Sequence, residues 1–190
     1  MKDDFFKAVY AGAMIAMGGA CYVKVGSVVG SLLFSVGLIT VCICNLNLFT
    51  GKILFINSPV ALALIWFGNL VGAVLVGLMC RFSGFTFDVS KKLSESPVTT
   101  ILLAIGCNIF IGIAVYGYKV TNSMIPIVLG VMGFINCGFE HCVANMFYFT
   151  LALTGELVGP VLLFLLFNTL GNVIGGFLIR PIFAYGTKKE

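Results

Sequence analysis

The residues best suited to chemistry lie together in the segment GFEHCVANMF, residues 138–147. It holds the only histidine of the chain, His141, between Glu140 and Cys142, with Asn145 four residues further on. These groups are compatible with a packing role, metal binding, catalysis or transport. Three consecutive residues on a helix cannot all face one point, and the sequence offers no second cluster of ligands. We therefore expect no metal, no cofactor and no enzyme active site.

The composition indicates that the natural solvent of the chain is lipid. The 190 residues are 60% hydrophobic and only 9% charged, with a mean hydropathy of +1.12. A helix needs roughly 20 apolar residues to cross about 30 Å of hydrocarbon. The apolar runs are Ala8–Val23, Val28–Cys44, Val60–Cys80, Val98–Tyr116, Ile125–Ile135 (resuming as Met146–Leu153) and Leu157–Ile179. The sequence predicts an all-α integral membrane protein, with six transmembrane helices in a single domain over residues 1–190.

The placement of positive charge predicts the orientation, because lysine and arginine are enriched in cytoplasmic loops. Counting by alternate loops gives seven such residues on the side of both termini and four on the other. The seven are Lys2, Lys7, Lys52, Lys119, Arg180, Lys188 and Lys189, and the four are Lys24, Arg81, Lys91 and Lys92. We expect both termini in the cytoplasm. Nothing in this distribution resembles a basic stripe for nucleic acid.

Polar residues break two of the six runs, the second and the fifth. The second run meets NLNLFTGK at residues 45–52, and the fifth meets NCGFEHCVAN at residues 136–145. Asparagine, threonine and glycine compete with helical hydrogen bonds or loosen them. Backbone groups freed in this way are too costly against lipid, so such breaks occur inside protein or beside a water-filled cavity.

A short internal match relates the two halves of the chain. The segment FGNLVGA at residues 67–73 resembles the segment that contains Asn172, and Asn69 pairs with Asn172 at an offset of 103 residues (172 minus 69). Three helices per repeat is an odd number, so the second copy must be inverted. We expect inverted halves of about 1–90 and 91–190, with a substrate path near the membrane midplane. We expect Asn69 and Asn172 to bond between helices and not to contact substrate.

The two breaks also carry a family resemblance. The segment Leu48–Thr50 and the long motif at residues 138–147 resemble the formate–nitrite transporter family, which moves small monovalent anions: formate, nitrite and, in one branch, hydrosulfide. The resemblance implies an aquaporin-like six-helix fold in the cell inner membrane. It also implies a homopentamer with one pore per protomer, and a first break that dips into the pore as a loop.

The resemblance assigns roles to particular residues. It places His141 at the centre of the pore, Thr50 in the re-entrant loop, Asn108 along the pore and Lys92 at the outer vestibule. The implied constrictions are apolar: Phe34, Leu38 and Leu48, with Phe49 in the loop, on the cytoplasmic side, and Ile111 and Phe134 on the periplasmic side. Glu140 is expected to pair with a backbone group or a lysine that pins the bent helix.

The chemistry leaves two hypotheses for His141. An ion at mid-membrane costs about 2.5 kcal/mol or more, and Lys92, Thr50 and backbone N–H groups at the broken ends can lower that cost. Apolar rings on the same route would still reject a hydrated ion. His141, whose type has an unperturbed pKa of about 6.5, can lend a proton to the anion, or it can stay neutral and only donate a hydrogen bond.

A pore for neutral solutes of the aquaporin type is the rival function, although the Asn-Pro-Ala tripeptide usual at its half-helix tips is missing here. No nucleotide-binding motif indicates ATP-driven pumping, so transport should be passive or coupled to protons. The residues leave open which of formate, nitrite and hydrosulfide is carried.

Overall fold

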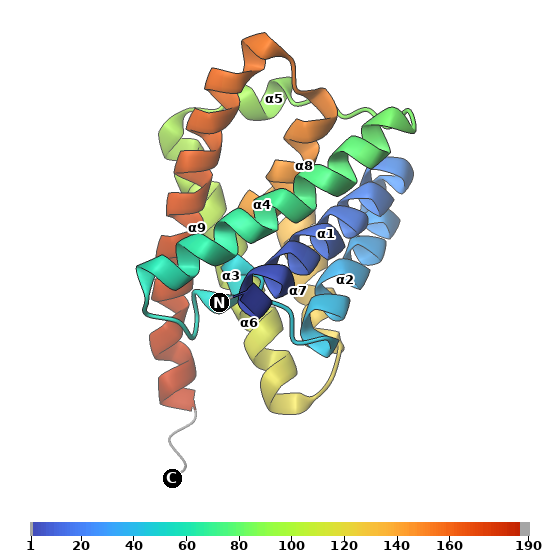
Figure 1. Ribbon diagram of the computed structural model, residues 1–190. Helices are drawn as coiled ribbons and strands as arrows, with labels where there is room; N and C mark the ends of the chain where they lie inside the picture. Colours follow the sequence, from blue (N-terminus) through green and yellow to red (C-terminus); the bar gives the residue numbers. More distant parts are fainter. Residues whose placement is uncertain (1, 187–190) are drawn as a thin grey trace.

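Helices make up nearly all of the protein, as Figure 1 shows. The computed structural model describes residues 2–186. In chain order the elements are α1 Lys2–Val25, α2 Ser27–Ile43, α3 Phe49–Lys52, α4 Pro59–Phe82, α5 Ser90–Leu93, α6 Pro97–Thr121, α7 Ile125–Asn136, α8 Cys142–Ala152, the 3-10 turn η1 Gly155–Leu157 and α9 Val158–Gly186. No strand occurs within residues 2–186. The predicted all-α class is confirmed.

Four helical segments are long and apolar enough to cross a membrane. They are Lys2–Val25, Pro59–Phe82, Pro97–Thr121 and Gly155–Ala184, whereas α2, α7 and α8 are shorter apolar helices. The polar breaks shorten the helices beside them. α2 ends at Ile43 and is followed only by the four-residue α3, and α7 ends at Asn136 before α8 begins at Cys142.

Two of the long helices begin with the same local signal, a serine followed by proline. The Ser58 hydroxyl accepts a hydrogen bond from Ala61 N–H at 3.3 Å, and the Ser96 hydroxyl accepts one from Thr99 N–H at 3.1 Å. Serine satisfies one of the free amides at a helix start, and proline fits the first helical position because it has no amide to satisfy. The sequence therefore fixes where α4 and α6 start.

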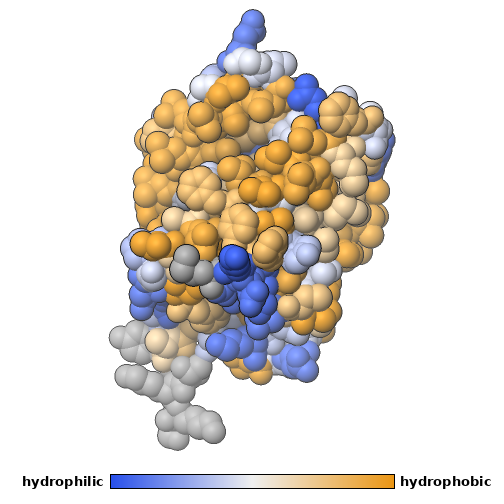
Figure 2. Space-filling model, viewed as in Figure 1, coloured by the Kyte–Doolittle hydropathy of each residue, from blue (hydrophilic) through white to orange (hydrophobic). Residues whose placement is uncertain are grey.

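Hydropathy is distributed as expected for a protein in lipid. Figure 2 shows an apolar face over most of this side of the molecule, with hydrophilic residues mainly near the N-terminus and below it, and a few at the top. Exposed residues include Val60 and Leu166, with 80% and 62% of their surface accessible. Five asparagines are instead at most 1% exposed: Asn69, Asn108, Asn145, Asn168 and Asn172. Polar groups lie inside and apolar groups outside, the arrangement that a hydrocarbon solvent favours.

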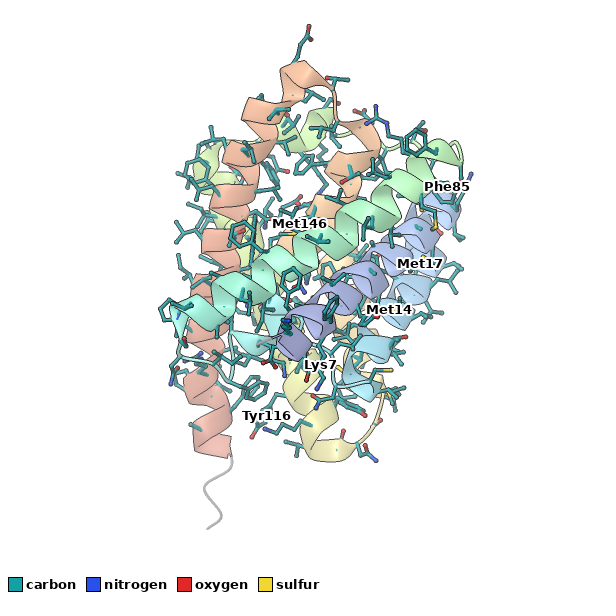
Figure 3. All side chains as sticks on the ribbon, in the orientation of Figure 1. Lys7, Met14, Met17, Phe85, Tyr116 and Met146 are labelled. Atoms are coloured by element: carbon teal, nitrogen blue, oxygen red, sulfur yellow. The ribbon has the colours of Figure 1, made fainter. Side chains whose placement is uncertain are left out.

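The side chains in Figure 3 distinguish the two ends of the bundle from its interior. Lys7 and Tyr116 lie toward the end at which α9 finishes, and Phe85 lies at the opposite end. Met146 of α8 lies between these ends, is 2% exposed and helps to fill the space enclosed by the long helices. Lys188 and Lys189, which the charge count includes, lie outside the described residues.

Glycines allow α4 to pack closely on α1 and α9 on α6. A methyl group at Gly72 would meet the carbonyl oxygen of Val9, and one at Gly175 would meet the carbonyl oxygen of Ile105. Small residues spaced four apart let membrane helices approach until their backbones touch. These two close pairs form the frame that holds the broken segments between them.

Replacing Gly72 with alanine tests this packing. The added methyl group has no room against α1, so we expect the free energy of unfolding to fall by about 1–3 kcal/mol. Gly155→Ala is the matched control, because a methyl group there meets no atom within 4 Å. Thermal unfolding in detergent measures both, and equal melting temperatures for the two variants would contradict the proposed contact.

Candidate functional site

The same backbone turn ends the helix before each break. After α2, Asn45 takes a left-handed φ of 48°, and Leu46 N–H donates to the Val41 carbonyl at 2.9 Å. After α7, Gly138 takes a left-handed φ of 69°, and the next amide, of Phe139, donates to the carbonyl of Phe134 at 2.9 Å. This is the glycine- or asparagine-capped helix end known as the Schellman motif. Asparagine and glycine are the residues that adopt left-handed backbone most readily, so the sequence places both breaks.

Asn69 of α4 holds the first break from inside the bundle. Its Oδ1 accepts a hydrogen bond from Phe49 N–H, the first amide of α3, at 2.8 Å. Its Nδ2 donates to the carbonyl of Asn47 at 2.9 Å and to the carbonyl of Ala8 in α1 at 2.7 Å. One buried amide thus bonds three backbone groups, and two of them, the Phe49 N–H and the Asn47 carbonyl, belong to the break, where lipid would leave them unpaired.

Asn172 of α9 makes the corresponding three bonds at the second break. Its Oδ1 accepts from Cys142 N–H, the first amide of α8, at 2.9 Å. Its Nδ2 donates to the carbonyl of Glu140 at 2.9 Å and to that of Ala104 in α6 at 2.8 Å. Both asparagines bond between helices, as predicted. The expectation that backbone amides at the broken ends face a permeant ion is wrong for these two first amides, because the asparagines already occupy them.

A direct hydrogen bond joins the two breaks. The Thr50 hydroxyl lies 3.0 Å from His141 Nε2, and the two side chains are buried at 0% and 2% exposure. The other ring nitrogen, Nδ1, accepts the backbone N–H of Ala144 at 3.2 Å and so caps α8. A neutral imidazole carries one N–H, so the proton is on Nε2 and is donated to the Thr50 oxygen. The Thr50 hydroxyl proton is then left for another acceptor.

A cavity of about 240 Å³ reaches His141 from the end of the molecule that holds α5. We call it the outer cavity. One face of α8 lines it with His141, Ala144, Asn145 and Tyr148, which follow the spacing of a single helix face. Its other lining residues include Tyr22, Lys91, Lys92, Glu95, Phe134 and Glu140.

Lys92 and Glu140 form an ion pair in the outer cavity. The Lys92 Nζ lies 2.6 Å from each carboxylate oxygen, and Glu140, which is 3% exposed, also accepts from Asn145 Nδ2 at 2.7 Å. Asn145 Nδ2 also donates to Asn168 Oδ1 at 2.8 Å, and Asn168 Nδ2 donates to the Glu140 carbonyl at 2.7 Å. A lysine does pin the bent segment, as expected, and the charge of Lys92 is engaged in doing so.

A second cavity of about 390 Å³ opens on the opposite side of the Thr50–His141 contact. We call it the inner cavity. Leu38 and Leu48 line it, together with Lys52 and Lys119. None of the described residues lines both cavities. Between them lie the buried side chains of Thr50 and His141.

Aromatic rings pack together beside His141, and they link residues that were expected on two different constrictions. The Phe34 ring packs edge-on against Phe134 with centroids 5.9 Å apart, and Phe134 stacks on the His141 ring at 5.7 Å. Phe34, expected on the cytoplasmic constriction, thus contacts Phe134, which is expected on the periplasmic one. Phe34 and Leu38 are one helical turn apart on α2, so the contacts with α7 decide which constriction each residue joins.

The remaining predicted residues are buried. Ile111 of α6 is 1% exposed and lines neither cavity. Asn108 Nδ2 donates to the carbonyl of Asn172 at 2.7 Å, while Asn108 Oδ1 has no hydrogen-bond partner in the described part of the chain. Within residues 2–186, no three His, Cys, Asp or Glu side chains converge as metal ligands would.

Sequence reasoning missed the contributions of Tyr148 and Glu95 to the outer cavity. Tyr148 lies seven residues after His141, so the helical period could have placed it on the same face. No local signal marks Glu95, which reaches the cavity only through the path of the connection between α5 and α6.

Apolar helices surround two buried breaks, and a cavity lies on either side of the Thr50–His141 contact. This arrangement is typical of a multi-pass membrane protein of the channel or transporter class. The chain belongs to the formate/nitrite transporter family, because the sequence model of that family, described as "Formate/nitrite transporter", matches residues 1–186. This confirms the resemblance seen in the two breaks.

Named relatives and solved structures agree with this membership. The formate channel FocA of Escherichia coli (strain K12) is 27% identical over a region that covers 75% of this chain and 64% of FocA. The formate channel FocB of the same strain is 24% identical over 78% of this chain and 66% of FocB. The chain thus spans about two thirds of the length of these curated relatives. A pentameric formate channel with formate bound, 24% identical, has a TM-score of 0.81 and covers 97% of this chain and 96% of its own. The fold is therefore shared, and the named relatives are channels, not enzymes.

The Lys92–Glu140 pair gives a testable prediction. Glu140→Gln leaves the Lys92 ammonium without its counter-charge, and we expect a loss of about 2 kcal/mol in unfolding free energy, between the values for exposed and buried pairs. The double variant Lys92→Met with Glu140→Gln should lose less unfolding free energy than the two single variants lose in sum. A double-mutant cycle by thermal unfolding in detergent measures this, and additive losses would show that the two side chains do not interact.

Proposed function

We propose that this chain forms a channel for small monovalent anions, with formate as the first candidate permeant. The observation that carries the proposal is the buried Thr50–His141 hydrogen bond, which lies between the outer and inner cavities. Membership of the formate/nitrite transporter family and similarity to channels named for formate support the choice of anion. Nitrite and hydrosulfide are the other candidates within the same chemical class.

We further propose that the two halves, about 1–90 and 91–190, form an inverted repeat of three membrane crossings each, in which α7 and α8 make one crossing. The matching helix ends and the matching bonds of Asn69 and Asn172 support this. Trp66 Nε1 also donates to Thr169 Oγ1 at 3.0 Å, and these residues are 103 apart, the same offset as between the two asparagines. A contact between equivalent residues is expected on a twofold axis that relates two copies.

In the proposed mechanism Thr50 binds the anion and His141 orients Thr50. Because the Ala144 amide occupies Nδ1, the neutral ring donates through Nε2 to the threonine oxygen. The threonine hydroxyl can then donate to a permeant anion at the point where bulk water is excluded. This geometry favours the hypothesis that His141 stays neutral over the hypothesis that it lends a proton.

The apolar constrictions have the role of stripping water from the ion and excluding larger solutes. Phe34 and Phe134 close the outer side, and Leu38 and Leu48 close the inner side. Phe49 and Ile111 fill the buried space near them. Side-chain rotations of such residues are fast, so brief openings can pass a small anion. Asn108 Oδ1, which has no partner within residues 2–186, can accept a hydrogen bond from a water molecule or from the neutral acid.

We propose that the chain assembles as a homopentamer in the cell inner membrane with both termini in the cytoplasm. A pentameric channel of the same fold and the exposed apolar surface support the assembly. The loop charges support the orientation: Lys7 and Lys119 act electrostatically on Lys52, so these three lysines lie at one end. The side on which they gather should face the cytoplasm.

Flux through proteoliposomes tests the function directly. Formate, nitrite and hydrosulfide should each be compared with water and glycerol, with and without a proton gradient. Anion flux well above that of protein-free vesicles, with little water or glycerol flux, is the expected result. Flux of water or glycerol without anions would instead establish the aquaporin-like alternative, and acceleration by a proton gradient would establish coupling.

Thr50→Val is the sharpest variant, because it keeps the shape of the side chain and removes the hydroxyl. A hydrogen bond to a charged group is worth about 1.5–3 kcal/mol, so formate flux should fall about tenfold to a hundredfold. Thr50→Ser keeps the hydroxyl and should retain most of the flux. Wild-type flux in the valine variant would exclude Thr50 as an anion ligand.

His141→Asn separates the two hypotheses for the histidine. Asparagine can still donate a hydrogen bond to Thr50 but does not titrate. If His141 stays neutral, formate flux should fall while its dependence on pH stays the same as in the wild type. Measurement across pH, with equal pH on both sides of the vesicle, checks this. A changed pH profile would instead support proton transfer by the imidazole.

A further inference from the structure

The outer cavity contains an acidic residue that the mechanism above does not use. Glu95 lies between α5 and α6 and lines the cavity, together with Lys91 and Lys92 and two further acidic residues, Asp88 and Glu140. With every group ionised, three negative charges outnumber two positive ones. Such a cavity would repel the anions that it is proposed to admit.

No described residue is paired with the Oε2 of Glu95. Lys92 is held at 2.6 Å by both oxygens of Glu140. Glu95 is partly buried, and its Oε2 is enclosed without any hydrogen-bond partner in the part of the chain that the structure describes. An ionised carboxylate with an enclosed, unpaired oxygen is costly, and adding a proton removes that cost.

The surroundings of Glu95 act in the same direction. Burial and then the charge of Glu140 raise the pKa of Glu95 above its ordinary value, and Lys92 and Lys91 only partly oppose this. Asp88 differs, because hydrogen bonds from Ser90 lower the pKa of its carboxyl, and its charge persists to lower pH. The other titratable groups on the cavity are His141, Tyr22 and Tyr148.

We propose that Glu95 is the titratable residue of an anion-binding site in the outer cavity. In its neutral form the carboxyl donates a hydrogen bond to an entering small monovalent anion, and in its ionised form it repels that anion. This inference rests on the proposed channel function and adds an outer site to it. As pH falls through the raised pKa of Glu95, the cavity loses a negative charge and anion entry increases.

Glu95→Gln tests the proposal, because glutamine imitates the neutral acid at every pH. In proteoliposomes with equal pH inside and out, the KM of the variant for formate should match the wild type at pH values below the raised pKa of Glu95. At pH values above that pKa it should be about fivefold lower than in the wild type, a value between the aqueous and low-dielectric limits for a nearby charge. The titration of formate itself is the same for both proteins, so the ratio of the two KM values isolates residue 95.

Asp88→Asn is the matched control, because it also removes a negative charge from the outer cavity. That charge stays constant over the pH range in which Glu95 titrates. The Asp88→Asn variant should lower the KM by a similar factor at all pH values and leave the pH profile unchanged. Glu156 is an exposed acid in η1, so Glu156→Gln should change neither the KM for formate nor its dependence on pH. Infrared difference spectroscopy of wild type against Glu95→Gln should also show a protonated carboxyl band that is lost as pH rises.

A Glu95→Gln variant with the pH profile of the wild type would overturn the proposal, provided that it elutes as the same oligomer. Loss of the protonated carboxyl band at the pH of an ordinary glutamate would also overturn it. Failure of the channel function itself looks different, because the wild type would then carry no formate at any pH.

Discussion

The fold depends on one constraint: in hydrocarbon every backbone N–H and C=O must find a partner inside the protein. Two interrupted helices violate that constraint locally, and two asparagines restore it. Asn69 and Asn172 each bond the first amide of the helix that follows a break, α3 or α8, and two carbonyls, one of which belongs to a neighbouring long helix. Without these six bonds the breaks would be driven back into continuous helices or out of the membrane.

The breaks bring polar chemistry to the centre of a protein that is apolar on the outside. Because the asparagines occupy the first amides, the side chains of Thr50 and His141 provide the polar contact between the two breaks. The Lys92–Glu140 pair, held by Asn145, fixes the second break from the outer side. Close glycine contacts between α1 and α4, and between α6 and α9, make the frame rigid enough to hold these groups at hydrogen-bond distance.

The charges that line the outer cavity also depend on which polar partners are available. In the proposed channel Lys92 has both a structural and an electrostatic role, and its pairing with Glu140 limits the attraction that it can exert on an incoming anion. Glu95, whose Oε2 has no partner among the described residues, then contributes to the charge of the same cavity. The balance of charge at the entrance is a property of the cavity and not of any single residue.

The sequence by itself determined the membrane solvent, the apolar runs, the position of both breaks and the place of the single histidine in the second break. These features are local, since hydropathy, capping residues and left-handed turns act over a few neighbouring positions. Tertiary structure decided which residues meet: Thr50 with His141 across 91 positions, Lys92 with Glu140 across 48, and Phe34 with Phe134. It also decided that Glu95 faces the outer cavity. Such contacts depend on how separate helices pack, and no local pattern encodes that packing.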